Sequence, residues 1–383
     1  DIDYIRVTTL EDDEVLDVVD YKQYDPLWKD EEYDHASGWA RNAEDTIERW
    51  GCALTSVAMV LDYHGYPVNP SSLNNWLKNQ KDGYIKNGMM NWLAVSRYTK
   101  ENPNNEGKAL EYSRYAANDT GKLDAELVAM RPGILGEPGH FVVAKGKTDA
   151  GYAINDPGYS DRLDLSSYND HFNSLGSYVP SSTDLSYVML VLDPEIEVEI
   201  KDENNNPILF DEYLQDPITD LVNGEEVSGE TVKIVLIPKP EKENYQLLLN
   251  GNGHYNLDWY LYDGNGEVVQ GNLDGVVNGG VGEVDKYLIS LKDSEMVVEI
   301  GRDLAGLIDE LQFKLVGKVG FLYDVLRGEL NLIESMLTKG QTFVSEVLLK
   351  VFYYHVRVFP EKFIDRSLAG ELKALIEAYW FTE

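Results

Sequence analysis

The chain has little cysteine, little positive charge and no long apolar run. It contains one cysteine, Cys52, among 383 residues, so no intramolecular disulfide can stabilise it. Its 33 Lys and Arg residues face 67 Asp and Glu residues, which gives a formal net charge of −34. Phosphates repel carboxylates, so this charge disfavours nucleic acids and anionic membranes. We therefore expect no nucleic-acid partner, and an acidic surface that suits neutral or cationic partners.

Two further absences limit the classes of function that the sequence allows. The most apolar segment, 347–359, is interrupted by Lys350 and Arg357, so no run reaches the ~18 residues that a membrane helix needs. No pair among the six histidines has the spacing of metal ligands. Residues 263–267 resemble a calcium loop but lack the ligand order of an EF-hand, which favours a plain hairpin turn. We expect no membrane span, no cofactor and no metal ion. The oligomeric state stays open.

The length predicts two or three domains, because it exceeds the size of most single cores. Changes in the apolar period divide the chain into four parts. These are an N-terminal arm (1–20) with a β-like run at Tyr4–Thr8, an α+β domain (21–194), a small β-sandwich-like domain (195–300) and a helical C-terminal region (301–383).

The α+β domain begins with helices and continues with strands. Helices are predicted over 53–64, from Asn69 to about residue 80 and over 88–100. Two strands then follow, joined by a turn at Thr148–Gly151, and the second ends at Asp156. A further strand over 185–193 closes the domain.

The rest of the chain carries no nucleophile–base pair of its own. Six β-like segments lie between 195 and 300, with a hairpin signal at 263–266 and a short helical insertion at 207–223. Three helices are predicted over 303–326, 329–358 and 367–381. We expect these regions to serve architecture or to bind a partner.

Cys52 lies at the start of the first strong helix, directly after Gly51. A helix N-terminus presents unpaired N–H groups and a partial positive charge, which favour thiolate over thiol. The small Gly51 leaves room for a substrate backbone to approach. A buried structural cysteine is the alternative reading at this position.

The positions of His140 and Asp156 favour a catalytic role for Cys52 over a structural one. His140 begins an apolar strand, where a polar ring suits a cleft better than a core. The turn at Thr148–Gly151 places Asp156 beside His140 on the neighbouring strand, where its carboxylate can orient the imidazole. Taken singly, a structural histidine and a turn-forming Asp-Pro remain open.

Four sequence blocks resemble a known family. They are Gln23-x-Asp25-Pro-x-Trp28, then Gly51-Cys52-x-x-Thr55, then Gly139-His140-Phe-Val-Val, and then Asn155-Asp156-Pro157. In this order they resemble the papain-like cysteine peptidases related to bacteriocin-leader (double-glycine) peptidases, in their stand-alone bacterial branch. The resemblance covers about residues 20–193. It implies a papain-like fold with Cys52 as nucleophile, His140 as general base, Asp156 as orienting acid and Gln23 in the oxyanion hole.

The sequence thus predicts a cysteine peptidase that hydrolyses peptide bonds through an acyl-enzyme. Its expected partner is a peptide or protein substrate. The alternatives are a catalytically inactive, peptidase-like surface interaction protein, and an amide ligase or transglutaminase that uses the same triad. Because the chain begins with Asp1, we expect a processed form that is secreted or lies on the bacterial cell surface, although a trimmed cytoplasmic form is also compatible.

Overall fold

The computed structural model describes residues 15–40, 44–181, 184–202, 204–216, 231–277, 285–292, 297–302, 304–339, 341–358 and 365–381. The β-like run expected at Tyr4–Thr8 lies outside these residues. Backbone contacts divide the chain into two compact units. The first takes most of the chain up to Ser186 together with Tyr262–Val268, and the second takes Tyr187–Leu214, Val232–Leu261 and the described residues from Val269 onward.

The first unit is built around one deeply buried helix, α2 (Cys52–Tyr63), as the apolar pattern predicted. Residues 53–61 of this helix are all buried. The other helices of this unit are η1 (Ala36–Gly38), α1 (Ile47–Trp50), α3 (Pro70–Lys78), α4 (Trp92–Glu101), α5 (Thr120–Val128) and η2 (Leu165–Tyr168). Asn69 caps α3 by accepting from Ser72 N–H, so this predicted start is confirmed.

Two differences from the sequence pattern concern this helical part. The predicted helix over 88–100 begins only at Trp92, because the hairpin of β1 (Tyr84–Lys86) and β2 (Met89–Met90) occupies its first residues. Helix α5 was not predicted. It is short and buries only Leu123, Glu126 and Leu127, which leaves a weak apolar period.

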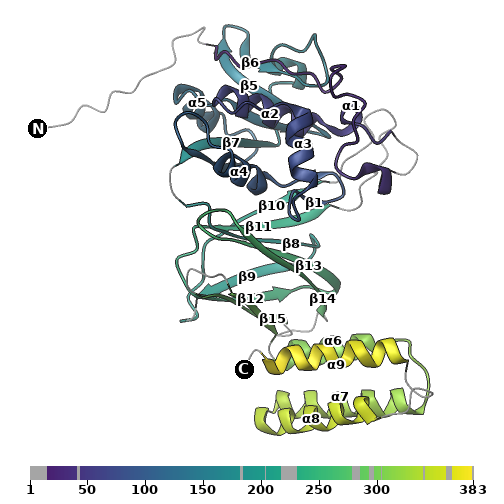
Figure 1. Cartoon of the computed structure of the whole chain (residues 1–383). Coiled ribbons are helices and arrows are strands. Elements are labelled where there is room, and N and C mark those ends of the chain that lie inside the picture. The colour runs from purple at the N-terminus through teal and green to yellow at the C-terminus, as the bar shows by residue number, and fades with distance from the viewer. Residues whose placement is uncertain are drawn as a thin grey trace, which may run out of the picture. The chain divides into compact units, whose positions relative to one another are not determined.

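A five-stranded antiparallel sheet forms the other half of the first unit. It contains β3 (Ala109–Tyr115), β4 (Gly133–Glu137), β5 (His140–Thr148), β6 (Gly151–Asn155) and β7 (Ser174–Ser181), in the order β3-β7-β4-β5-β6. Figure 1 shows α2 lying against β5, and Ser56 of α2 donates a hydrogen bond to the Phe141 carbonyl of β5 (3.3 Å). This packing brings the start of α2 to the strand that begins with His140.

The segment predicted as an arm is part of the first unit from Val15 onward. Val15 forms a bridge with Gly146, and Leu16 N–H donates to the Lys145 carbonyl. The side chains of Leu16 and Val18 are buried. The segment therefore lies along the edge of β5 and leads directly to Gln23.

The second unit contains two antiparallel sheets with one shared core. The first has the order β10-β11-β8-β13-β14, and the second β16-β15-β12-β9. Their strands are β8 (Tyr187–Leu192), β9 (Glu197–Asp202), β10 (Asp211–Gln215), β11 (Val232–Pro238), β12 (Asn244–Asn250), β13 (Gly253–Tyr262), β14 (Val268–Val277), β15 (Asp285–Lys292) and β16 (Val297–Arg302). Leu190 and Leu257 from the first sheet pack in one cluster with Leu247 and Ile289 from the second.

Two expectations are corrected in this unit. The strand predicted at 185–193 forms as β8, but it pairs with β11 in the second unit instead of closing the first. All its side chains are buried, so its sequence could not tell which sheet it joins. Within 207–223, residues 211–215 form the strand β10 beside β11, and not a helix. The predicted hairpin at 263–266 is present between β13 and β14.

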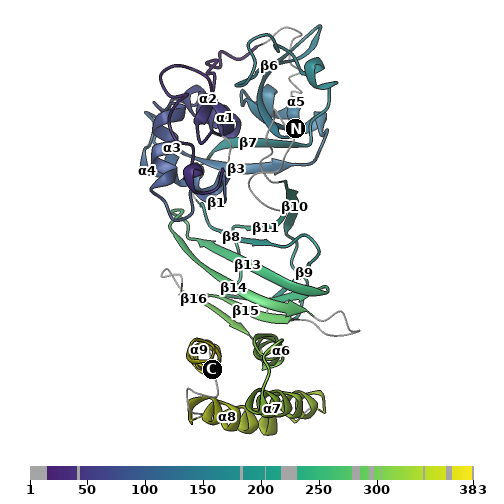
Figure 2. The same ribbon diagram turned by 90° about the vertical axis from the view of Figure 1, so that its right-hand side faces the viewer.

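The helical tail has four described helices instead of the three predicted. They are α6 (Leu304–Lys314), α7 (Phe321–Thr338), α8 (Thr342–Val358) and α9 (Arg366–Phe381). The predicted first helix ends early because Gly317 and Gly320 have φ values of 71° and 137°, which are not helical. Figure 2 shows α6 with α9 and α7 with α8 in two layers, and all four helices contribute to one apolar core.

Candidate active site

Cys52 is the first residue of α2, and its side chain is partly exposed. The N–H groups of a helix's first turn have no intrahelical acceptor. Among the described residues, we find no backbone hydrogen bond from Cys52 N–H. Gly51 is required just before it, because a Cβ there would lie 2.6 Å from the Ile47 carbonyl oxygen. The chain therefore presents the sulfur and a free N–H at the same point.

His140 and Asp156 form a buried pair. Nε2 of His140 lies 2.7 Å from Oδ1 of Asp156. The antiparallel pairing of β5 with β6 carries both residues to one end of the sheet, as the predicted turn implied. The other ring nitrogen, Nδ1, is buried and has no hydrogen-bond partner among the described residues. It is the ring nitrogen left to react with a neighbouring group.

The electrostatics of the pair link it to Cys52. Burial alone would lower the pKa of His140, but the hydrogen bond with Asp156 and the interaction with the Cys52 sulfur raise it to about 9. Burial would raise the pKa of Asp156, yet hydrogen bonds from His140, Tyr168 and Gly158 hold it below its usual value. An imidazolium beside a carboxylate is therefore the stable state of the pair at neutral pH.

The loop that follows Asp156 encloses this pair. The Tyr168 hydroxyl donates to Oδ2 of Asp156 (2.5 Å), and its ring stacks on the imidazole with centroids 6.2 Å apart. The Tyr159 ring approaches His140 edge-on at 5.9 Å. Arg162 lies over the Tyr159 ring (3.5 Å) and donates to the Tyr168 hydroxyl (2.9 Å). The sequence pattern did not identify these residues, because their contacts depend on how the loop folds back over the ring.

Gln23 lies between the two halves of the site. Its backbone N–H donates to the Pro157 carbonyl (2.9 Å), next to Asp156. Its side-chain Nε2 donates to the Glu48 carbonyl (2.5 Å), one helical turn before Cys52. In an uninterrupted helix this carbonyl would accept the Cys52 N–H. The Gln23 amide thus takes that acceptor, and a second N–H remains on its nitrogen.

Glu137 is a second buried acid near His140 that sequence analysis did not single out. It pairs with His140 across the two-residue turn of β4 and β5, so both side chains lie on one face of the sheet. Its side chain is 7% exposed, and Oε1 has no partner among the described residues. Burial raises its pKa to about 7, although the charge of His140 opposes this shift.

Comparison with known proteins decides the family of this region. Residues 16–180 match the model of the Peptidase_C39 like family. This region is a C39-like peptidase domain. The match confirms the resemblance to C39-like peptidases at the level of the family, and the matched residues include Gln23, Cys52, His140 and Asp156. It also begins at residue 16, where the chain joins β5. A search of curated proteins found no match.

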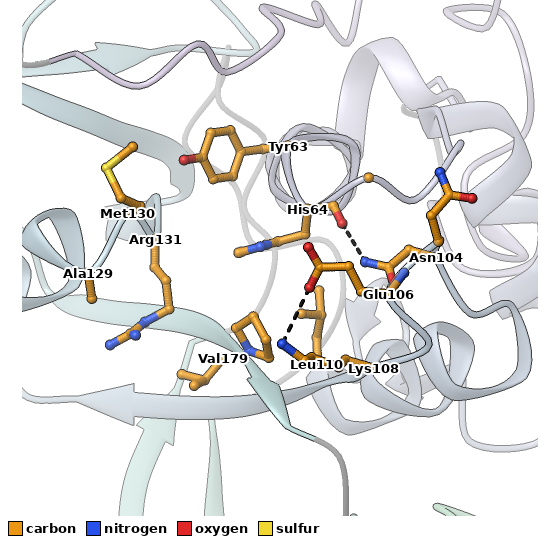
Figure 3. Close-up of a pocket in the computed structure, with 13 residues that line it drawn as sticks. Tyr63, His64, Asn104, Glu106, Lys108, Leu110, Ala129, Met130, Arg131 and Val179 are labelled. Carbon is orange, nitrogen blue, oxygen red and sulfur yellow. Dashed lines mark hydrogen bonds and ion pairs between the residues drawn. The ribbon is translucent and has the colours of Figure 1, made fainter.

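A separate pocket lies at the far end of α2. It has a volume of about 550 Å³. Figure 3 shows the ring of His64, the C-terminal cap residue of α2, pointing toward the side lined by Met130 and Arg131. Burial and the charge of Arg131 lower the pKa of His64 to about 4. None of the four predicted site residues lines this pocket, so it does not belong to the candidate active site.

Proposed function

We propose that the C39-like domain is a cysteine peptidase that hydrolyses peptide bonds. The observation that carries the proposal is the placement of His140. One ring nitrogen is held by Asp156, and the other is left for Cys52 at the start of α2. This order of acid, base and nucleophile is the arrangement that activates a thiol.

Cys52 and His140 carry out the proton transfers of the proposed reaction. The Cys52 thiol gives its proton to Nδ1 of His140, and the sulfur attacks the scissile carbonyl carbon. The imidazolium then returns the proton to the amide nitrogen, the C–N bond breaks, and a thioester remains on Cys52. Water, deprotonated by His140, hydrolyses the thioester and releases the acid.

The oxyanion of each tetrahedral intermediate needs hydrogen-bond donors. We assign this role to the Cys52 N–H and to the second N–H of the Gln23 amide. Both are fixed before substrate binds, because Gln23 is anchored to Pro157 and Glu48. Loss of one such donor typically lowers the rate about 10²–10³-fold, and we expect this loss for Gln23→Ala. An unchanged kcat in Gln23→Ala would show that the Gln23 side chain takes no part in the oxyanion hole.

Cleavage of a peptide library by the whole chain, with Cys52→Ala as control, tests the activity. We expect cleavage that the variant abolishes. Equal cleavage by both proteins would refute the proposal. Adding an amine acceptor separates hydrolysis from ligation or transglutamination, because only a transferase would form the amine adduct.

Alkylation of Cys52 by iodoacetamide tests the site without a known substrate. Cys52 is the single cysteine, so the modified mass reports on this sulfur alone. We expect fast alkylation near neutral pH that slows in His140→Ala, because thiolates react and thiols do not. Rates that match a free thiol in both proteins would favour the inactive, binding-only alternative.

A further inference from the structure

Helix α8 of the tail is apolar on two opposite faces. One face packs Leu349, Phe352 and Val356 into the core of the tail. The other presents an exposed row that we call the α8 stripe. Its members are between 40% and 77% exposed, and they are Phe343, Val344, Val347, Val351, Tyr354 and Val358.

A helix with apolar side chains on two opposite faces normally packs against a partner on both. Contiguous apolar patches on a soluble chain mark interaction sites. Among the described residues, nothing of this chain buries the α8 stripe. Its main positions are 343, 347, 351, 354 and 358, which recur at intervals of four, four, three and four residues. This spacing suits the seam of two packed helices.

The charges near the stripe disfavour a membrane as its occupant. Helices that lie in a membrane surface are rich in Lys and Arg on their polar face. On α8, Glu346 shares one flank of the stripe with Lys350 and Arg357, and the whole chain has a charge of −34. No described helix is long and apolar enough to cross a membrane. A protein surface of matching pattern is the better occupant.

The same charges fit a second copy of the chain in antiparallel orientation. At 100° per residue, Glu346, Lys350 and Arg357 fall on one flank of the stripe. An antiparallel pair with its two-fold axis between residues 350 and 351 places Val347 against Tyr354 and Phe343 against Val358, and the two Val351 side chains near the axis. It also sets each Glu346 beside Arg357 of the other copy, and these two opposite-charge pairs outweigh the single approach of Lys350 to its own copy at the axis. A parallel two-fold pair would place this flank of the two helices on opposite sides of the seam, so Glu346 and Arg357 could not pair.

We propose that the α8 stripe is the seam of an antiparallel homodimer. Two-fold dimers are the commonest oligomers, and they need one self-complementary patch, which this stripe provides. The proposal does not depend on the peptidase activity. It gives the helical tail the task of joining two chains, and therefore two C39-like domains.

Light scattering during size-exclusion chromatography tests the dimer. We expect twice the mass of one chain for the parent, and half that mass for Val351→Glu. The substitution brings two carboxylates together at the axis, which should raise the dissociation constant about 100-fold or more. Leu209→Glu, at a side chain 96% exposed in the second unit, is the matched control and should stay dimeric. A parent that is monomeric at every concentration, or a Val351→Glu protein that stays dimeric, would overturn the proposal.

Further variants show whether a loss of the dimer comes from misfolding. Circular dichroism should show unchanged helix content in Val351→Glu and in Val347→Glu, because both side chains are partly solvated. Reversal of one flank charge, Glu346→Arg or Arg357→Glu, should weaken the dimer about two- to fivefold, and the double reversal should restore it. Failure of the double reversal to restore the affinity would contradict the antiparallel register.

Cysteine cross-linking tests directly whether the two α8 helices run antiparallel. With the natural thiol removed by Cys52→Ala, Val351→Cys should form a disulfide-linked dimer under mild oxidation. Phe343→Cys alone should not, because its expected partner is Val358 at the other end of the seam. Equal cross-linking at both positions would indicate a parallel pair, and cross-linking at neither would indicate a different occupant. Either result would refute the proposal.

Discussion

Tyr168 and Asp156 are joined by a hydrogen bond from the tyrosine hydroxyl to Oδ2, while Oδ1 of the same carboxylate faces His140. Backbone N–H groups of Gly158 and Tyr159 also donate to Oδ1. Asp156 is fully buried, and apart from His140 the groups shown donating to its carboxylate all come from the loop that follows it. Tyr168 is therefore a positioning residue for the proposed triad.

Removal of the Tyr168 hydroxyl should lower turnover without unfolding the domain. A hydrogen bond to a charged group is worth about 1.5–3 kcal/mol, so Tyr168→Phe should lower kcat about 10- to 100-fold. KM should change little, because the phenyl ring still stacks on His140. Tyr159→Phe is the control, since its hydroxyl is not among the groups that bind Asp156. Equal losses in both variants would show that the loop acts through general packing alone.

Replacement of Asp156 should shift the pH range of activity. Its hydrogen bond and charge raise the pKa of His140 to about 9, whereas burial acts in the opposite direction. In Asp156→Asn the carboxylate's contribution is lost while burial and the Cys52 sulfur remain, so the imidazolium should deprotonate at a lower pH. The alkaline limb of kcat/KM, or an NMR titration of the His140 ring, measures this shift. An unchanged limb would mean that Asp156 does not control the base.

The same pair links stability to pH. His140 has a higher pKa in the folded chain than its usual 6.5, so the folded state holds more protons between about pH 6.5 and 9. The stability that this pair contributes is complete below about pH 6.5 and is lost as the pH rises through 9. Asp156→Asn should therefore show a flatter decline of the melting temperature over this range.

Sequence could predict where Cys52, His140 and Asp156 lie in the fold, because each of them ends or begins an element with a clear signal. Cys52 precedes a strongly apolar helix, and His140 and Asp156 flank a hairpin whose turn is evident. The roles of Tyr168 and Arg162 could not be predicted, because they depend on how an irregular loop folds back over the ring. The strand β10 was missed for a similar reason, since its pairing with the distant β11 leaves little mark on its own residues.

Glu137 should make the fold less stable as the pH rises toward neutrality. Its pKa rises from 4.5 to about 7 on folding, so the folded state binds the proton more tightly and loses stability between those values. A shift of this size corresponds to at most about 3 kcal/mol. Glu137→Gln should be more stable than the parent above pH 7 and nearly equal to it below pH 4.5. Chemical unfolding at both pH values measures the difference, and exposed Glu195→Gln is the control. The same gain at both pH values would rule out ionisation as its cause.

The turn before Cys52 should tolerate no side chain. At residue 51 a Cβ would lie 2.6 Å from the Ile47 carbonyl oxygen and 2.7 Å from its Cγ2 atom, so Gly51→Ala must displace either α1 or the start of α2. Overpacking of this kind costs about 1–3 kcal/mol. The displacement also moves the sulfur relative to His140, so alkylation of Cys52 should slow together with the loss of stability. Gly38→Ala is the matched control, because a Cβ there meets no atom within 4 Å. Normal stability and normal Cys52 reactivity in Gly51→Ala would show that this turn can adjust, and that the sulfur is positioned by some other part of the domain.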